Sequence, residues 1–267
     1  KSGSKYFLGN RYKFSSRNKY NIDFLEIFNV IKKLDWDSKF WGYNVAFLSA
    51  RKLSDNILSR INNFIEKNNI RLVEYLCDCH DQHSVSLAEL NGFEFKDIRL
   101  TFVLNPQNVE VNKREPTADI SIAKDVDVPT LRNISQNIYK DSRYHYDKNF
   151  DTKNTIEFYM LWVEKAVYGT YDDECFVLKL QDKIEAFCTV KYLGNSSAQV
   201  GLVGVNKAKT GSGLGKLLMF NFILKMKQKN IENLYVITQG RNYSAQKLYQ
   251  RVGFVTFSTE LWYHKWI

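Results

Sequence analysis

Three glycines at alternate positions, Gly211, Gly213 and Gly215, separate two apolar segments of the chain. Residues 198–205 are typical of a buried strand, and residues 214–226 carry leucine, phenylalanine and methionine at helical spacing. Glycine has no Cβ, so it permits a tight turn and lets a ligand approach the backbone closely. We therefore predict a strand, a glycine turn and a helix in succession, with free N–H groups of the turn facing an anion.

Two other glycine motifs do not fit this turn. In a P-loop counted back from Gly215, the first glycine falls on Thr210, and Leu217 stands where a metal-binding hydroxyl is needed. A dinucleotide motif that starts at Gly211 needs a third glycine where Lys216 stands. An ordinary strand-to-helix turn without a ligand remains the alternative for the glycines alone.

Composition narrows the class of protein. The chain has 267 residues, 44% of them hydrophobic, and a formal net charge of +9. No apolar run approaches the roughly 20 residues that cross a bilayer, and the first twenty residues lack a signal core, so we expect a soluble cytoplasmic protein with no membrane partner. The lysines are dispersed, so small polyanionic ligands explain the charge as well as nucleic acid does, and no nucleic-acid partner is expected.

Four cysteines, Cys77, Cys79, Cys175 and Cys188, are too few to suggest a disulfide framework in a chain of this size. Cys77 and Cys79, followed by His80 and His83, superficially resemble a metal site. However, Cys-x-Cys spacing is atypical for zinc, and residues 71–79 have the pattern of a buried strand. We therefore expect no bound metal.

The order of predicted elements suggests two domains. Residues 1–116 are expected to form an N-terminal α/β domain, in which residues 35–42 make an aromatic turn and Ser54 caps a helix. A polar linker with two prolines at residues 105–117 precedes a second domain over residues 117–267. That domain is expected to contain strands at 175–180, 184–192, 198–205, 234–238 and 255–265, with a loop at 142–151 and a helix at 243–251.

The two halves of the chain show a weak sequence similarity to each other. A leucine-containing helix runs into Gly92-Phe93 much as a later one runs into Gly253-Phe254, with Ala88 opposite Tyr249. The N-terminal domain can thus be a degenerate copy of the C-terminal one. A chance likeness is the alternative, because Gly-Phe after a helix is common.

Residues from about 118 onward resemble the GCN5-related N-acetyltransferase (GNAT) family. The likeness rests on Val203-Gly204-Val205, on the alternate glycines, and on Asn242, Ala245, Leu248 and Tyr249 followed by Gly253-Phe254. It implies an α/β fold, of the α+β kind, with a mixed and mostly antiparallel sheet, and an enzyme that takes its acyl group from acetyl-CoA. The implied acetyl-CoA-binding residues are Val203, Gly204, Val205, Thr210, Gly211, Ser212, Gly213, Leu214, Gly215, Lys216, Asn242 and Tyr249. The usual Arg or Gln before the glycines is Thr210 here, so one side-chain contact to the diphosphate is lost.

A closer likeness covers nearly the whole chain. The chain is similar to bacterial GNAT enzymes that acylate the 4-amino group of a TDP-linked 4-amino-4,6-dideoxyhexose. The matching stretches include residues 34–42, Ser142-Arg143-Tyr144 and the aromatic strand that ends at Lys265. The likeness implies a sugar-nucleotide substrate. It leaves open the epimer, the carbon that carries the amine, the length of the acyl group and the oligomeric state, for which a homodimer is one option.

The resemblance also implies catalytic roles. Backbone N–H groups at residues 203–205 would stabilise an oxyanion, and Tyr249 would serve as the acid for the departing thiolate. Asp97 maps to the general base, although the family carries a longer Glu there. The bland alternatives are that Tyr249 is a core tyrosine and that Asp97 is a solvent-facing strand residue.

Arg143, Tyr144 and Tyr146 combine positive charge with aromatic faces, so we expect them to bind the nucleotide and diphosphate of the substrate. A loop without a ligand is the alternative. Two other functions remain open: an acetyltransferase that acts on a protein, peptide or other small amine, and a non-catalytic sensor of acyl-CoA.

Overall fold

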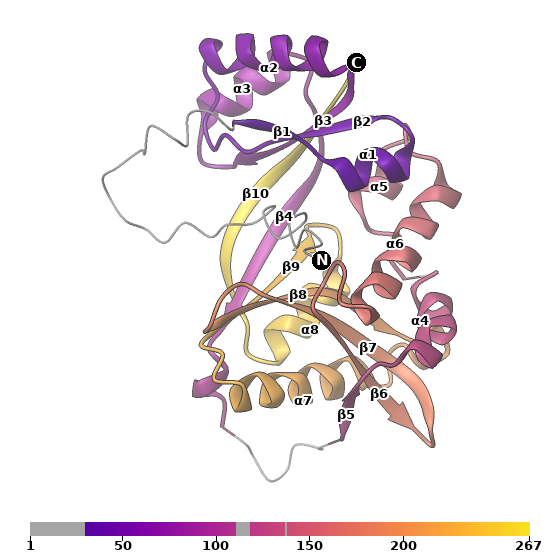
Figure 1. Ribbon diagram of the computed structural model, residues 1–267. Helices are drawn as coiled ribbons and strands as arrows, with labels where there is room; N and C mark the ends of the chain where they lie inside the picture. Colours follow the sequence, from indigo (N-terminus) through magenta and orange to yellow (C-terminus); the bar gives the residue numbers. More distant parts are fainter. Residues whose placement is uncertain (1–29, 111–117, 137) are drawn as a thin grey trace, which may run out of the picture. The chain divides into compact units, whose positions relative to one another are not determined.

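The computed structural model describes residues 30–110, 118–136 and 138–267, which divide into two compact units (Figure 1). Unit 1 comprises the described residues up to Ile98 together with Glu260–Ile267, and unit 2 is Arg99–Thr259. Strands β4 (Glu94–Leu104) and β10 (Val255–Trp266) contribute residues to both units. The domain boundary expected between residues 116 and 117 lies outside the described residues.

Unit 1 is a small sheet with helices packed against it. Its sheet has the order β1-β2-β3-β10, in which β2 and β3 are parallel and the other pairs are antiparallel. Besides β4 and β10, its elements are β1 (Ile31–Lys33), α1 (Asp35–Trp41), β2 (Asn44–Leu48), α2 (Asp55–Asn68), β3 (Ile70–Asp78) and α3 (Gln82–Leu90).

Helix α2 shows why this sequence folds locally as it does. The Ser54 hydroxyl accepts from the backbone N–H of Ile57 and so caps the helix, as the sequence predicted. Leu58, Ile61 and Ile65 recur at helical spacing and are buried in the core of unit 1. In Figure 1, α2 and α3 lie on the same side of the strands β1 to β3.

The aromatic segment at residues 35–42 is a helix, so the prediction of a turn is wrong. Helix α1 ends where Gly42 adopts a left-handed conformation (φ 77°). The Ser38 hydroxyl donates to the carbonyl oxygen of Leu34 over 2.6 Å and accepts from the N–H of Val45 over 2.9 Å. This hydroxyl therefore joins the helix to the start of β2, and the tertiary tie stabilises a helix too short to persist alone.

Unit 2 contains the sheet order β4-β9-β8-β7-β6-β5, in which β8 and β9 are parallel and the other neighbouring strands are antiparallel. The strands after β4 are β5 (Ile120–Ile122), β6 (Glu174–Leu180), β7 (Lys183–Tyr192), β8 (Ser197–Val205) and β9 (Asn233–Gln239). The helices are α4 (Val128–Ser135), α5 (Arg143–Tyr146), α6 (Thr152–Val167), α7 (Leu214–Gln228) and α8 (Tyr243–Arg251). Short 3₁₀ turns are η2 (Pro106–Asn108), η3 (Asp125–Asp127) and η4 (Lys207–Lys209).

The two faces of the unit 2 sheet carry different helices. Cys188 and Val190 of β7 belong to a core that includes Leu218 and Phe222 of α7. Thr189 lies between them in the strand, so its side chain points to the opposite face, where it meets residues joined to α6. Helices α7 and α8 therefore cover one face, and α4 and α6 the other (Figure 1).

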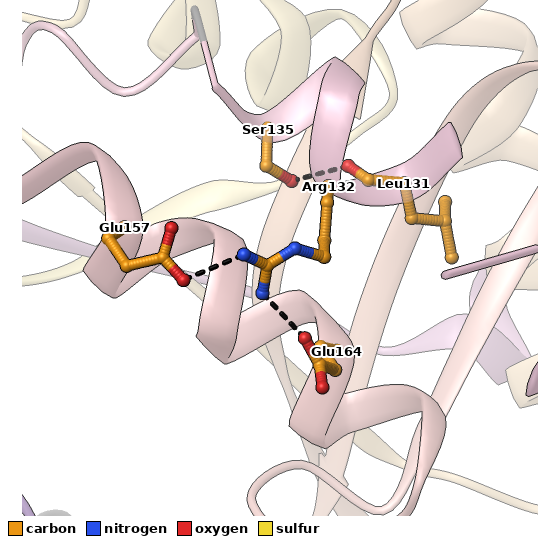
Figure 2. A network of polar contacts seen from close by, with 5 residues as sticks. All are labelled: Leu131, Arg132, Ser135, Glu157 and Glu164. Atoms are coloured by element: carbon orange, nitrogen blue, oxygen red, sulfur yellow. Dashed lines mark hydrogen bonds and ion pairs between the residues drawn. The ribbon is translucent and has the colours of Figure 1, made fainter. Parts of the chain in front are cut away.

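Helices α4 and α6 are joined by an arginine with two carboxylate partners (Figure 2). Arg132 of α4 places Nη2 2.7 Å from Glu157 Oε1 and Nη1 2.5 Å from Glu164 Oε2. The two glutamates are seven residues apart, so they lie on one side of α6 two turns from each other. The guanidinium thereby fixes the position of α4 along α6.

The predicted fold class is confirmed: the structure is a mixed α/β fold with an open, mostly antiparallel sheet. The proposal that the N-terminal half is a degenerate copy stays a prediction. Over the described ranges, no helix is long and apolar enough to cross a membrane.

Candidate active site

Strands β8 and β9 pair along only the first part of their length and then diverge. Their parallel register runs from Ser197↔Asn233 to Val200↔Val236 and stops there, although β8 continues to Val205 and β9 to Gln239. Beyond that point β8 still pairs with β7, and β9 still pairs with β4. The facing edges of the two strands are thus left without partners from each other, and such backbone groups are available to a ligand.

The divergence coincides with a β-bulge. Cys188 of β7 is opposite Val203, whereas Val190 is opposite Val200, so β8 has one residue more than β7 in this stretch. Val200 and Val203 consequently face the same core although they are three residues apart. The bulge therefore lies next to Val203, Gly204 and Val205, the residues expected to carry the oxyanion donors.

The glycine turn follows directly after β8. Gly211 and Gly213 have positive φ values of 84° and 85°, and no atom lies within 4 Å of a Cβ added at either. Conformation, rather than a crowded neighbour, thus requires glycine at both positions. Thr210, Gly211, Ser212 and Gly213 are exposed, and Gly213 is the N-cap of α7.

The start of α7 presents backbone N–H groups that come before its first helical hydrogen bond. An i to i−4 bond runs from the Leu217 N–H to the Gly213 carbonyl oxygen, so the N–H groups of Leu214 and Gly215 precede the helical ladder. These donors and the positive end of the helix dipole favour an anion. The predicted strand, glycine turn and helix are present in the expected order.

Gly215 also lies where α7 packs against α8, which the sequence did not reveal. A Cβ at this position would stand 3.3 Å from Cδ2 of Leu248 on α8. The absence of a side chain therefore lets α7 and α8 approach closely. Asn242 caps α8, because its Oδ1 accepts from the Ala245 N–H over 3.0 Å.

Tyr249 of α8 is buried, with 4% of its surface exposed, and its ring contacts Phe102 and Phe254. Burial, with a smaller contribution from the Cys188 thiol, raises the pKa of Tyr249 above the ordinary value of a phenol. The phenol is therefore protonated at neutral pH and can donate to another group.

A second phenol, Tyr139, was missed by sequence reasoning. Its hydroxyl donates to the carbonyl oxygen of Val203 over 3.3 Å. Burial raises the pKa of Tyr139 well above the ordinary value of a phenol, with a smaller contribution from Tyr249. Tyr139 stands outside every motif, and no pattern in the sequence indicated it.

The segment expected to bind the substrate contains a short helix, α5, where a loop was predicted. Arg143 and Tyr144 are buried, and the Arg143 guanidinium lies 4.2 Å from the Tyr144 ring centroid. Tyr146 is 58% exposed, and the guanidinium of Arg241 lies 3.8 Å from its ring centroid. Tyr146 and Arg241 therefore form the accessible aromatic and cationic pair of this region, and Arg241 was not foreseen.

Asp97 lies on the unit 1 part of β4 and is 1% exposed. Its Oδ1 accepts from the Ile98 N–H over 2.8 Å. The alternative that it is a solvent-facing strand residue is therefore wrong, while its role as a base stays a prediction.

The metal-like sequence around Cys79 forms a compact turn in unit 1. Asp78, Cys79 and His80 bring one ligand atom each to within 4.8 Å of one another. Asp78 Oδ1 accepts from the His80 N–H, so the turn itself accounts for this proximity. All four cysteines of the chain are free thiols. The expectation of no metal remains a prediction.

Comparison with known proteins assigns the class. Residues 135–254, which hold β8, the glycine turn, α7, β9 and α8, match the model of the acetyltransferase (GNAT) family. The protein is an acetyl-CoA-dependent N-acetyltransferase. More particularly, it contains a domain of the GNAT family, as the sequence predicted.

Two curated relatives are similar to this chain. The dTDP-fucosamine acetyltransferase of Escherichia coli O6:H1 is 25% identical over 243 residues, which are 88% of this chain and 97% of the relative. The mycothiol acetyltransferase of Saccharomonospora viridis is 30% identical over 73 residues, which are 27% of this chain and 24% of the relative.

Solved structures share the fold. A GCN5-related N-acetyltransferase from Kribbella flavida aligns with a TM-score of 0.60 at 11% identity and covers 88% of this chain and 86% of its own. A conserved protein of unknown function from Staphylococcus epidermidis aligns with a TM-score of 0.59 at 12% identity, over 84% and 85% of the two chains.

Proposed function

We propose that this enzyme transfers the acetyl group of acetyl-CoA to the amino group of a nucleotide-linked amino sugar, a dTDP-4-amino-4,6-dideoxyhexose. The observation that carries the proposal is the similarity to dTDP-fucosamine acetyltransferase, which extends over 88% of this chain and 97% of the relative. The match to the mycothiol acetyltransferase, by contrast, covers 27% of this chain and 24% of that relative.

The glycine turn supports the binding of acetyl-CoA. Its positive-φ glycines leave open space above the backbone, and the N–H groups at the start of α7 suit a diphosphate. The unpartnered edge of β8 beyond Val200 suits the amide-bearing pantetheine arm, since amides bind well to free strand edges. Asn242 is half-buried at the start of α8 and can add a side-chain amide to this arm.

Acetyl-CoA supplies an activated acetyl group as a thioester. The amine nitrogen forms a bond to the thioester carbon, the carbon–sulfur bond breaks to release the thiolate, and the nitrogen loses its second proton to solvent. A backbone N–H group within the stretch Val203–Val205 stabilises the oxyanion, and a donor of this kind is worth about 3 kcal/mol. The ammonium proton leaves first to Asp97, directly or through water, because an ammonium has no lone pair.

Tyr249 assists the departing sulfur. An ordinary phenol has a pKa near 10 and a thiol near 8.5, so complete proton transfer is uphill by about 2 kcal/mol, and burial increases this cost. We therefore assign Tyr249 a hydrogen bond to the sulfur in the transition state, with solvent completing the protonation. Arg143, Tyr144 and Tyr146 are assigned to the nucleotide and diphosphate of the sugar substrate.

The test is thiol release from acetyl-CoA by the purified protein, with and without a dTDP-4-amino-4,6-dideoxyhexose. The proposal expects release that depends on the sugar nucleotide and a product heavier by one acetyl group in mass spectrometry. A lysine-containing peptide and spermidine serve as alternative acceptors. Faster release with either of these than with the sugar nucleotide would contradict the proposed substrate while leaving the acetyltransferase class intact.

A further inference from the structure

The β8 bulge is held by a buried polar network that no motif includes. Thr189 of β7 accepts a hydrogen bond at Oγ1 from the backbone N–H of Leu202 over 2.8 Å. The same hydroxyl donates to Asp172 Oδ2 over 2.5 Å, and Trp162 Nε1 donates to that oxygen over 3.0 Å. Thr189 and Asp172 are both buried, so solvent does not compete with these bonds.

The network occupies the space that a side chain on β8 would need. A Cβ built on Gly201 would stand 2.6 Å from Thr189 Oγ1 and closer still to the Asp172 carboxylate. Gly201 does not have a positive φ, so a turn is not the reason for a glycine here. Its lack of a side chain instead leaves room for the Thr189 hydroxyl and the Asp172 carboxylate. The sequence of β8 is thus adapted to the polar network.

Hydrophobic packing alone would not require this arrangement. A valine at position 189 has almost the shape of threonine, and a buried carboxylate is costly to desolvate. What only the hydroxyl supplies is an acceptor for the Leu202 N–H, which in an unbulged ladder would bond to a neighbouring strand. The network therefore stabilises the bulge in preference to a regular strand.

The bulge decides where β8 can pair. It lies at the end of the β8–β9 register, after Val200↔Val236 and before Val203. A regular strand would carry the register forward and would shift every following backbone group by one position. The orientation of the N–H groups at residues 203–205 consequently depends on the bulge.

We propose that Asp172 and Thr189 are positioning residues for acetyl transfer. They hold the bulge at Gly201 and Leu202, so that β8 stays apart from β9. The backbone N–H groups of β8 that follow the bulge can then meet the thioester carbonyl. Thr189 bonds the backbone directly, and Asp172 orients the Thr189 hydroxyl while Trp162 orients Asp172. The link to catalysis rests on the proposed function, whereas the link to the backbone does not.

The test compares Thr189→Val with Thr189→Ser, and uses Thr155→Val as a matched control. Thr155 is a buried threonine of α6 whose hydroxyl donates to the Asp151 carbonyl oxygen. Steady-state kinetics and amide hydrogen exchange of the Leu202 N–H are measured on each folded variant. We expect Thr189→Val to lower kcat at least tenfold and to accelerate Leu202 exchange at least tenfold. Thr189→Ser and Thr155→Val should stay within threefold of the wild type in both.

Trp162→Phe provides a milder second variant, because it removes one donor to Asp172 and keeps an aromatic ring. It should lower kcat and Leu202 protection by a smaller factor than Thr189→Val. If Thr189→Val keeps wild-type kcat and wild-type Leu202 protection, the proposal is wrong. Accelerated exchange with unchanged kcat would overturn the catalytic half. If the wild type released no thiol with any acceptor, the proposed function would fail, and the exchange measurement would still decide the backbone role.

Discussion

The Tyr139 hydroxyl donates to the Val203 carbonyl oxygen over 3.3 Å, and the Tyr139 ring stacks on Tyr159 of α6 at a centroid distance of 4.4 Å. Tyr159 in turn stacks on Trp162, which donates to Asp172. One aromatic row on α6 therefore supports both bonds that hold the bulged part of β8, at the Leu202 N–H through Thr189 and at the Val203 carbonyl oxygen through Tyr139.

Replacing Tyr139 with Phe removes the bond to Val203 and keeps the stacked ring. We expect a loss of unfolding free energy of about 1 kcal/mol, typical of one hydrogen bond, and a severalfold fall in kcat/KM for acetyl-CoA. Urea unfolding and steady-state kinetics measure the two effects. A fall in stability with unchanged kcat/KM would mean that this bond supports the fold alone.

Tyr249→Phe tests the proposed acid. The variant should lower kcat roughly a hundredfold, within the range of general acid catalysis, and leave the Kd for acetyl-CoA within about twofold. Calorimetry and thiol release give the two numbers. Tyr192→Phe is the control, because the Tyr192 hydroxyl donates to Glu174 and takes no part in the proposed chemistry. Equal turnover in the two variants would remove Tyr249 from the mechanism.

Gly213→Ala tests the glycine turn. An alanine at φ 85° costs on the order of 1–2 kcal/mol of backbone strain, and its relief would move the N–H groups at the start of α7. We expect KM for acetyl-CoA to rise about tenfold. Gly42→Ala imposes a similar strain at φ 77°, also with no atom within 4 Å of the new Cβ, and should leave this KM unchanged. A similar rise in both variants would show that the loss of stability, not the turn, is responsible.

Asp97→Asn tests the proposed base. The variant should lose most of its activity at neutral pH and recover part of it at alkaline pH, where more of the amine substrate is already unprotonated. The kcat/KM for the sugar nucleotide is measured from pH 6.5 to 9.5. A profile parallel to that of the wild type would argue against Asp97 as the base.

Asp172→Asn tests the charge state of the buried network. Burial raises the pKa of Asp172, against the opposing effects of Thr189, Trp162 and Lys191, with Asp173 adding to the rise. The folded protein therefore binds this proton more tightly than the unfolded chain, so the carboxyl's contribution to stability falls as pH rises from about 4 through the folded pKa. The asparagine side chain does not titrate, so the variant lacks this dependence of the unfolding free energy on pH.

The stability of Asp172→Asn relative to the wild type should thus improve as pH rises over that interval. Urea unfolding at several pH values between 4 and 7 measures the difference, and all other titrating groups are common to the two proteins. A difference that does not vary with pH would mean that Asp172 titrates alike in both states.

Local signals in the sequence predicted the elements that carry the glycine turn and α8. Helix α8 has the predicted bounds because Asn242 caps it and its apolar residues recur at helical spacing. The signals for α1 and α5 were weak, since each helix is short. Ser38 ties α1 to β2, and Ser142 caps α5 through the His145 N–H. Short helices of this kind depend on tertiary contacts that a single sequence does not display.

The polar network of Thr189, Asp172 and Trp162 could not be predicted from the sequence for a different reason. Asp172 and Thr189 are seventeen residues apart, and they meet only because β6 and β7 pair and α6 packs on them. One signal was present: Gly201 is an isolated glycine inside a strand, which often marks a bulge. Its partners could not be named, because nothing in the spacing links position 201 to Asp172.

The division of the chain has a consequence for its synthesis. Glu260–Ile267 pair along β3 as a strand of unit 1, yet the ribosome makes them only after all of unit 2. Until then Tyr75 and Leu76 of β3 lack the neighbours Tyr263 and Trp262 on one edge. Unit 1 therefore cannot complete its sheet before β10 has been synthesised, and until then the edge of β3 stays open to wrong pairing.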